Sequence, residues 1–318
     1  MSPLVKALYF VFDIILPLSV GYLLVRRMGR KERLYDLLML VGILFIAPVL
    51  GLLSCWAIKL ESRLMWLPVL GVAMQVIPGV AGFLRAKHKP YDALAKGSYM
   101  LSAILSNRGF VGAFTVFILF GEVGYGWANL VMLLAPPVVY GMCFPMAQYF
   151  YSTHHAGAGR KDSIFSFVFN RNQVPMIGVI AGFGLSLAGV ERPPVLGDVF
   201  RGVVHVLAWM ILVPVGSAID FKEMRGYWRD VFDLLPIKFV ITPLLTWLLG
   251  WGVGLDGPVL ATAVILAASP VAINAIIVAK LQNLNVHLAI AAFVLTTVVY
   301  LFVVFPLTLM VVAWLGLT

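Results

Sequence analysis

Two apolar segments of the sequence are interrupted near their centres by residues whose chemistry suits a small anion. The segment over residues 98–121 contains the run SNRGFVG at residues 106–112. A glycine inside a helix costs about 1 kcal/mol relative to alanine, and a central arginine costs roughly 2.5–3.5 kcal/mol on membrane-insertion scales. We therefore expect this helix to break here, with Asn107 capping the half that restarts.

The segment over residues 258–279 carries a comparable interruption. Ser269 and Pro270 lie near its middle, and Asn274 follows about one turn later. Proline lacks an N–H donor and disfavours helical geometry in the residue before it. We interpret Ser269 as an N-cap and Pro270 as the first residue of a restarted helix. For either segment alone, a simple kink with an asparagine that binds a neighbouring helix is the alternative interpretation.

Broken helices of this kind favour anion binding. Each restart presents free N–H groups and a partial positive charge, so two restarts that meet near the membrane centre form an anion site. Asparagine side chains would add hydrogen bonds, and an arginine would add a full charge that complements a carboxylate. We therefore predict a substrate-binding site made of Asn107, Arg108, Gly109, Ser269, Pro270 and Asn274.

The elements that carry these residues are predicted to be membrane-spanning helices. Of the 318 residues, 62% are hydrophobic and only 12% are charged, whereas a soluble domain is roughly half apolar and about a quarter charged. A span needs about 20 mainly apolar residues. The sequence predicts an all-α membrane protein with ten spans, near residues 4–25, 34–57, 64–84, 98–121, 127–150, 173–190, 198–219, 231–253, 258–279 and 287–315.

The positive residues support this division. With the N-terminus outside, sixteen of the 23 Lys and Arg residues fall in inner loops and five in outer loops, while Arg108 and Lys238 lie within spans. Loops on the cytoplasmic side of membrane proteins carry such an excess. We therefore expect both termini in the periplasm of a bacterial inner membrane. The net charge of +9 is explained by these loops and does not indicate a nucleic-acid partner.

Five spans in each half would place the halves in opposite orientations. We expect residues 1–150 to form one five-helix repeat, residues 151–171 a cytoplasmic linker, and residues 172–318 a second, inverted five-helix repeat. Inverted repeats are common in secondary transporters, whose substrate site lies near the midplane where the halves meet. The two interrupted segments are the fourth and ninth spans, which hold the same position in their halves.

The motifs in these segments resemble those of the auxin efflux carrier family, which includes plant PIN-type carriers and bacterial malate permease-like proteins. The run at residues 107–112 is similar to the family's Asn-x-Gly-Phe-x-Gly signature, and the second half agrees through PMIG at 175–178, VPVGS at 213–217 and SPVAINA at 269–275. The resemblance implies ten helices in which helices 4 and 9 cross where they break. It also implies carboxylate binding beside the crossing, involving Asn107, Pro270 and Asn274, and a homodimer whose scaffold includes the second and seventh helices.

The chain departs from the family pattern at two positions. Phe114 stands where the signature ends in proline, so the break must rest on Gly109 and Gly112. Arg108 stands where a small or uncharged residue is usual. This arginine indicates either a more anionic substrate, such as a dicarboxylate, or an internal ion pair that consumes the charge.

Two further polar residues in predicted spans are candidates for proton or ion coupling. Asp13, in the first span, is interpreted as a proton carrier, a partner for Arg108, or a residue that faces water. His205, in the seventh span, is either a pH-sensitive group or a hydrogen-bonded structural histidine.

Several functional classes lack their sequence signatures. The chain has no nucleotide-binding loop, metalloprotease motif or nucleophile elbow, and Cys55 and Cys143 lack metal-site spacing. We expect no enzymatic activity, cofactor or metal site. The expected function is secondary transport of small organic anions such as carboxylates, dicarboxylates or auxin-like acids, by alternating access and with H⁺ or Na⁺ as candidate coupling ions. The alternatives are a sodium-coupled symporter of the bile-acid type and a non-transporting membrane receptor.

Overall fold

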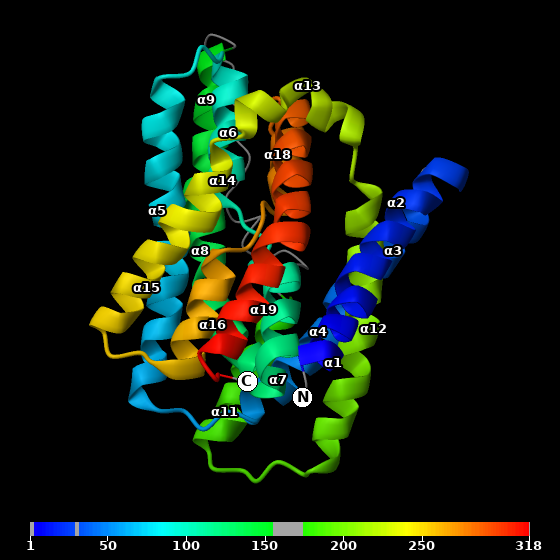
Figure 1. The fold of residues 1–318 in the computed structure, drawn as a ribbon, viewed down its shortest axis with the longest axis vertical. Coiled ribbons are helices and arrows are strands. Elements are labelled where there is room, and N and C mark those ends of the chain that lie inside the picture. Colours follow the sequence, from blue (N-terminus) through cyan, green and yellow to red (C-terminus); the bar gives the residue numbers. More distant parts are fainter. Residues whose placement is uncertain (1–2, 29–31, 155–173, 318) are drawn as a thin grey trace.

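Figure 1 shows the fold as a computed structural model, in which residues 3–28, 32–154 and 174–317 are described. The predicted linker lies mostly outside these residues. Regular structure in the described ranges is helical apart from one isolated antiparallel bridge between Ser106 and Val271. Seven helical stretches in these ranges are long and apolar enough to cross a membrane, namely Leu4–Arg27, Glu32–Trp56, Ser62–Lys87, Arg108–His154, Val195–Ser217, Leu234–Gly252 and Val286–Trp314.

In the first half, π-helical turns lie inside several of the predicted spans, and helical structure continues past the predicted end of the fourth span at Gly121. In chain order they are α1 (Pro3–Phe10), η1 (Val11–Ile15), α2 (Leu16–Met28), α3 (Glu32–Val41), η2 (Gly42–Ile46), α4 (Ala47–Trp56), η3 (Ser62–Met65), α5 (Trp66–Lys87), α6 (Ala93–Ile104), η4 (Arg108–Gly112), α7 (Ala113–Met132), α8 (Ala135–Val138), η5 (Val139–Cys143) and α9 (Phe144–His154). The η3 element is a 3₁₀ helix, and the other η elements are π-helical.

The second half contains two apolar helices shorter than a full span, α11 (Val174–Leu187) and α16 (Gly257–Ala267). The remaining elements are α12 (Val195–Ser217), α13 (Phe221–Val231), α14 (Leu234–Pro236), the π-helical η7 (Ile237–Ile241), α15 (Thr242–Gly252), α17 (Ile273–Leu281), α18 (Val286–Val299), the π-helical η8 (Tyr300–Val304) and α19 (Phe305–Trp314). Both chain termini lie at the same end of the bundle, and α13 lies at the opposite end (Figure 1).

Glycines bring α2 and α12 into backbone contact. A Cβ added to Gly21 would lie 1.9 Å from the carbonyl oxygen of Val213, and one added to Gly216 would lie 2.1 Å from that of Leu18. No larger residue fits such an approach. Small residues are the usual means by which membrane helices pack closely, so these two helices form one rigid pair.

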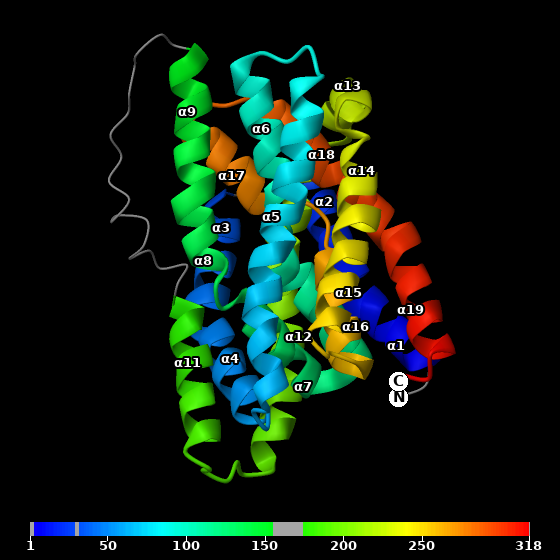
Figure 2. The ribbon, with the colours of Figure 1, turned by 90° about the vertical axis from the view of Figure 1, so that its left-hand side faces the viewer.

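A second glycine contact joins α4 to α11, which lie side by side in Figure 2. A Cβ on Gly178 would lie 1.9 Å from the carbonyl oxygen of Pro48, and one on Gly182 would lie 2.4 Å from that of Leu52. The first contact joins the first and seventh predicted spans, and this one joins the second and sixth. Exchanging the two halves of the chain converts one contact into the other. We call α2, α4, α11 and α12 the scaffold helices.

Candidate functional site: the crossing of two broken helices

The fourth and ninth predicted spans both break near their centres, as expected. Helix α6 ends at Ile104, and helical structure resumes with η4 at Arg108. Helix α16 ends at Ala267, and α17 begins only at Ile273. The predicted restart at Ser269 and Pro270 is therefore wrong, because the chain stays non-helical for several more residues. The N-cap of α17 is Ala272, which has an extended backbone and no side-chain cap.

The extended residues of the two breaks pair with each other. The backbone N–H of Asn107 donates to the Pro270 carbonyl at 2.7 Å, and that of Ala272 donates to the Leu105 carbonyl at 3.0 Å. These bonds form the isolated antiparallel bridge between Ser106 and Val271. Backbone groups without partners are costly inside a membrane, and here each break satisfies the other. The extended pairing explains why α17 restarts later than the proline suggested.

The closest approach at the crossing is at Gly112. A Cβ on this residue would lie 2.4 Å from Oγ of Ser269 and 3.0 Å from Cδ2 of Leu266. Gly109 faces elsewhere, because its Cβ would meet the terminal methyl of Met132 at 3.0 Å. The tight contact between the two broken helices therefore depends on Gly112.

The two predicted asparagines lie in different environments. Asn107 is buried, and its Oδ1 accepts a hydrogen bond from the Val111 N–H at 3.5 Å, so it caps the restarted helix as predicted. Asn274 lies on the first turn of α17 with an exposed side chain. The amide of Asn107 is thus fixed by the fold, whereas that of Asn274 is accessible from outside the protein.

Arg108 begins the π-helical turn η4 and is only 5% exposed. Its Nη1 is buried and has no hydrogen-bond partner. No ion pair joins it to a carboxylate in the part of the chain that the structure describes. The interpretation of Arg108 as half of an internal ion pair is therefore wrong for these residues. A buried guanidinium nitrogen without a hydrogen-bond partner is costly, and an ionisable residue inside a membrane span is a candidate for function.

A second buried cation, Lys238, was counted within a span but not predicted as part of the site. It lies in the π-helical turn η7, is completely buried, and donates from Nζ to Oγ of Ser106 at 2.7 Å and to the carbonyl of Leu105 at 3.3 Å. The sequence feature that could have identified Lys238 is a charged residue inside the predicted span at 231–253.

A hydrogen bond from α18 stabilises the ninth-span break. The backbone N–H of Val271 donates to Oγ1 of Thr296 at 3.0 Å, and that hydroxyl donates in turn to the Ala292 carbonyl at 2.7 Å. Ser269 is fully buried, and its Oγ has no partner. Buried polar atoms almost always have partners. Two unpaired polar atoms, this Oγ and Nη1 of Arg108, therefore lie in the segments that cross.

Asp13 and His205 form a pair away from the crossing. Nδ1 of His205 lies 2.8 Å from Oδ2 and 2.9 Å from Oδ1 of Asp13, which is buried. Tyr9 stacks on the imidazole at 5.2 Å, and Phe117 of α7 meets it edge-on at 5.9 Å. His205 is thus the hydrogen-bonded histidine that one interpretation expected. The interpretations of Asp13 as a partner of Arg108 and as a residue facing water are wrong.

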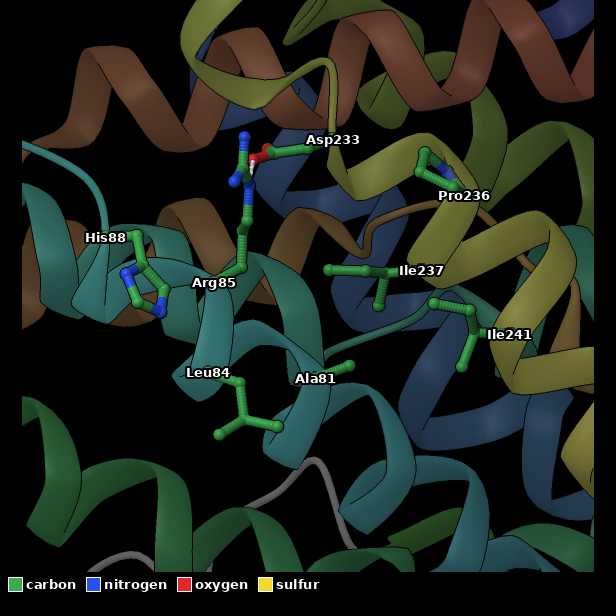
Figure 3. A pocket seen from close by; sticks show the side chains of 8 residues that line it. All are labelled: Ala81, Leu84, Arg85, His88, Asp233, Pro236, Ile237 and Ile241. Atoms are coloured by element: carbon green, nitrogen blue, oxygen red, sulfur yellow. Dashed lines mark hydrogen bonds and ion pairs between the residues drawn. The ribbon is translucent and has the colours of Figure 1, made fainter.

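Two cavities lie apart from the crossing. One, of about 500 Å³, lies between α5 and the α14–η7 segment and holds the ion pair of Arg85 and Asp233, whose side chains point toward each other at 2.6 Å (Figure 3). The other, of about 400 Å³, includes Lys6 and Gly121 in its lining. Neither is lined by the predicted site residues. We therefore assign the site from the buried unpaired polar atoms at the crossing and not from the cavities. Burying a polar atom without a hydrogen bond costs free energy, and a bound ligand would remove that cost.

Comparison with known proteins supports the resemblance seen in the motifs. Residues 167–310 match the model of the family described as membrane transport protein. No curated protein matches the chain. The matched stretch contains Lys238, the ninth-span break and Thr296, and several helices of the bundle are apolar enough to cross a membrane. The second half of the chain is therefore similar to the membrane transport family of the auxin efflux carriers, and the chain is a multi-pass membrane protein.

Proposed function

We propose that this protein is a secondary active transporter of small organic anions, such as carboxylates, dicarboxylates or auxin-like acids. The observation that carries the proposal is the buried guanidinium of Arg108, whose Nη1 has no partner. Oγ of Ser269 is also buried and unpaired, and it belongs to the other broken helix. A carboxylate accepts hydrogen bonds from both kinds of donor, so it would satisfy both groups at once.

We propose ten crossings in two inverted five-helix repeats. Three observations support this architecture: the breaks occupy the fourth and ninth predicted spans, exchange of the halves relates the two glycine contacts, and both termini lie at one end of the bundle. The 47-residue helical stretch Arg108–His154 is long enough for two crossings. The excess of Lys and Arg in alternate loops supports periplasmic termini in a bacterial inner membrane.

In this proposal, alternating access is a movement between two groups of helices. The scaffold helices are held together by backbone contacts at Gly21, Gly216, Gly178 and Gly182, and sliding within either pair would require clashes. The crossing helices α6–α7 and α16–α17 carry the anion site and move relative to this scaffold. The family resemblance supports a homodimer whose scaffold includes the second and seventh spans.

The Asp13–His205 pair is our candidate for proton coupling. It lies on η1 and the scaffold helix α12, and Phe117 of α7 touches its imidazole. A change of charge on this pair would therefore alter the contact between the scaffold helix α12 and the crossing helix α7. Histidine is the side chain whose charge ordinarily changes between pH 5 and 8.

The test is counterflow of radiolabelled mono- and dicarboxylates in proteoliposomes. We expect Arg108→Ala and Asn274→Ala to abolish transport while membrane expression stays normal. Arg201→Ala is the matched control, since Arg201 is exposed and pairs with Asp198 of its own helix. Normal dicarboxylate transport by Arg108→Ala or by Asn274→Ala would show that the site is assigned wrongly. Binding of these anions without counterflow would favour a receptor.

A further inference from the structure

We propose that the ammonium group of Lys238 takes the place of an inorganic coupling cation at the break of the fourth span, so that the protein neither binds nor requires Na⁺. The first part concerns the site itself and needs no substrate. The second part, on coupling, rests on the proposed transport function.

The position of the ammonium group is that of a cation site. Its two acceptors are the carbonyl of Leu105 and the hydroxyl of Ser106, both oxygen ligands. Leu105 is the C-cap of α6, where the free carbonyls of a helix give its end a partial negative charge. In transporters with discontinuous helices, such half-helix ends and unwound carbonyls coordinate Na⁺. Here the chain supplies a cation of its own at that place.

The surroundings of Lys238 disfavour the binding of a second cation. Lys238 is completely buried and its Nζ already occupies the oxygens of Leu105 and Ser106, so an added Na⁺ would have to displace it. Among the described residues, no carboxylate pairs with Lys238, and no cluster of three or more His, Cys, Asp or Glu side chains could hold a metal ion. A sodium-coupled symporter of the bile-acid type would need such groups near the crossing.

The same arrangement occurs a second time in the protein. Lys6 of α1 is buried and donates from Nζ to the carbonyl of Leu119 at 2.9 Å. That carbonyl precedes Gly121, where α7 leaves helical geometry with φ 69°. At both helix interruptions, a buried lysine from another helix donates to a main-chain carbonyl beside the interruption. The ninth-span break differs, because there the hydroxyl of Thr296 accepts a hydrogen bond from the backbone N–H of Val271.

The experiment measures Na⁺ itself on the purified full-length protein in detergent. Binding of radioactive Na⁺ and the melting temperature in NaCl are compared with choline chloride, for the wild type and for Lys238→Ala. We expect the wild type to bind no Na⁺ saturably and to melt at the same temperature in both salts. Lys238→Ala should melt lower in choline chloride and be raised by NaCl or by ethylammonium chloride, since a ligand that binds only the folded state stabilises it.

The control is Lys280→Ala, which removes an exposed charge from α17 and should show no salt-specific change. Saturable Na⁺ binding by the wild type would overturn the proposal, and so would a Lys238→Ala protein that Na⁺ and ethylammonium leave unchanged. If Lys238→Ala does not fold in either salt, two other measurements decide the question. The first is Na⁺ binding by the wild type, and the second is the same salt comparison on Lys238→Gln, whose amide keeps a donor without a charge. No organic anion is present, so a failure of the transport proposal in counterflow is a separate result.

Discussion

Substituting Gly112→Ala would place a methyl group where the two broken helices touch. Its Cβ would lie 2.4 Å from Oγ of Ser269, 3.0 Å from Cδ2 of Leu266 and 3.6 Å from the carbonyl of Asn107. The serine hydroxyl can rotate away, whereas the Leu266 side chain is fully buried and has to shift within a packed region; the contact with the Asn107 carbonyl is an ordinary one. Overpacking of this kind costs about 1–3 kcal/mol. We expect a loss near 2 kcal/mol in the free energy of unfolding.

The contact can be isolated with a double-mutant cycle. Ser269→Ala removes the nearest atom, so the cost of Gly112→Ala should fall by about 1 kcal/mol in that background, within the usual range for residues in contact. The assay is denaturation of the purified protein by SDS, read by tryptophan fluorescence, with counterflow measured on the same samples. Gly202→Ala is the control, since a Cβ there has open space and alanine favours the helix.

Two results would refute this reasoning. If Gly112→Ala is as stable and active as the wild type, the two helices do not approach as closely as the structure has them. If Ser269→Ala gives no relief, the clash lies with another atom. Equal losses at Gly112 and Gly202 would point to a general effect of added volume rather than to the crossing.

Three other substitutions test separate contacts. Asn107→Asp keeps the oxygen that caps the restarted helix, so thermal stability should hold, but its negative charge beside Arg108 should abolish counterflow; retained transport would place the anion elsewhere. Asp13→Asn should remove the dependence of transport on an imposed proton gradient, and an unchanged dependence would exclude the pair with His205 from coupling. Lys6→Met removes the buried donor to the carbonyl of Leu119 and should cost about 1–3 kcal/mol in unfolding free energy, with the loss absent if water reaches that carbonyl.

The breaks themselves could be predicted from sequence because their causes are local. Glycines, a proline and an asparagine in the middle of apolar runs disfavour an uninterrupted helix. Asn107 then caps the helical turn that follows it. The start of α17 could not be predicted in the same way. It is set by hydrogen bonds to residues 105–107, which lie in the other half of the chain.

Lys238, which joins the site in the structure, had no local partner in the sequence. Its acceptor hydroxyl, on Ser106, lies 132 positions away, and Asp13 and His205 are separated by 192 positions. A periodic pattern identifies which segments are helices, but it does not identify which helices meet. The remaining signal was the cost of a charged residue in an apolar run, which marked Arg108 and applies equally to Lys238.

The bridge between the two breaks also sets an order of events during synthesis. The carbonyl of Leu105 and the N–H of Asn107 receive their partners from Ala272 and Pro270. These residues are translated about 165 positions later, a delay on the order of 10 s at about 5–20 residues per second. Until then the fourth span carries backbone groups without partners in or near the membrane, where they are costly. The newly made first half is therefore the stage at which membrane chaperones and quality-control proteases have the greatest opportunity to act on this protein.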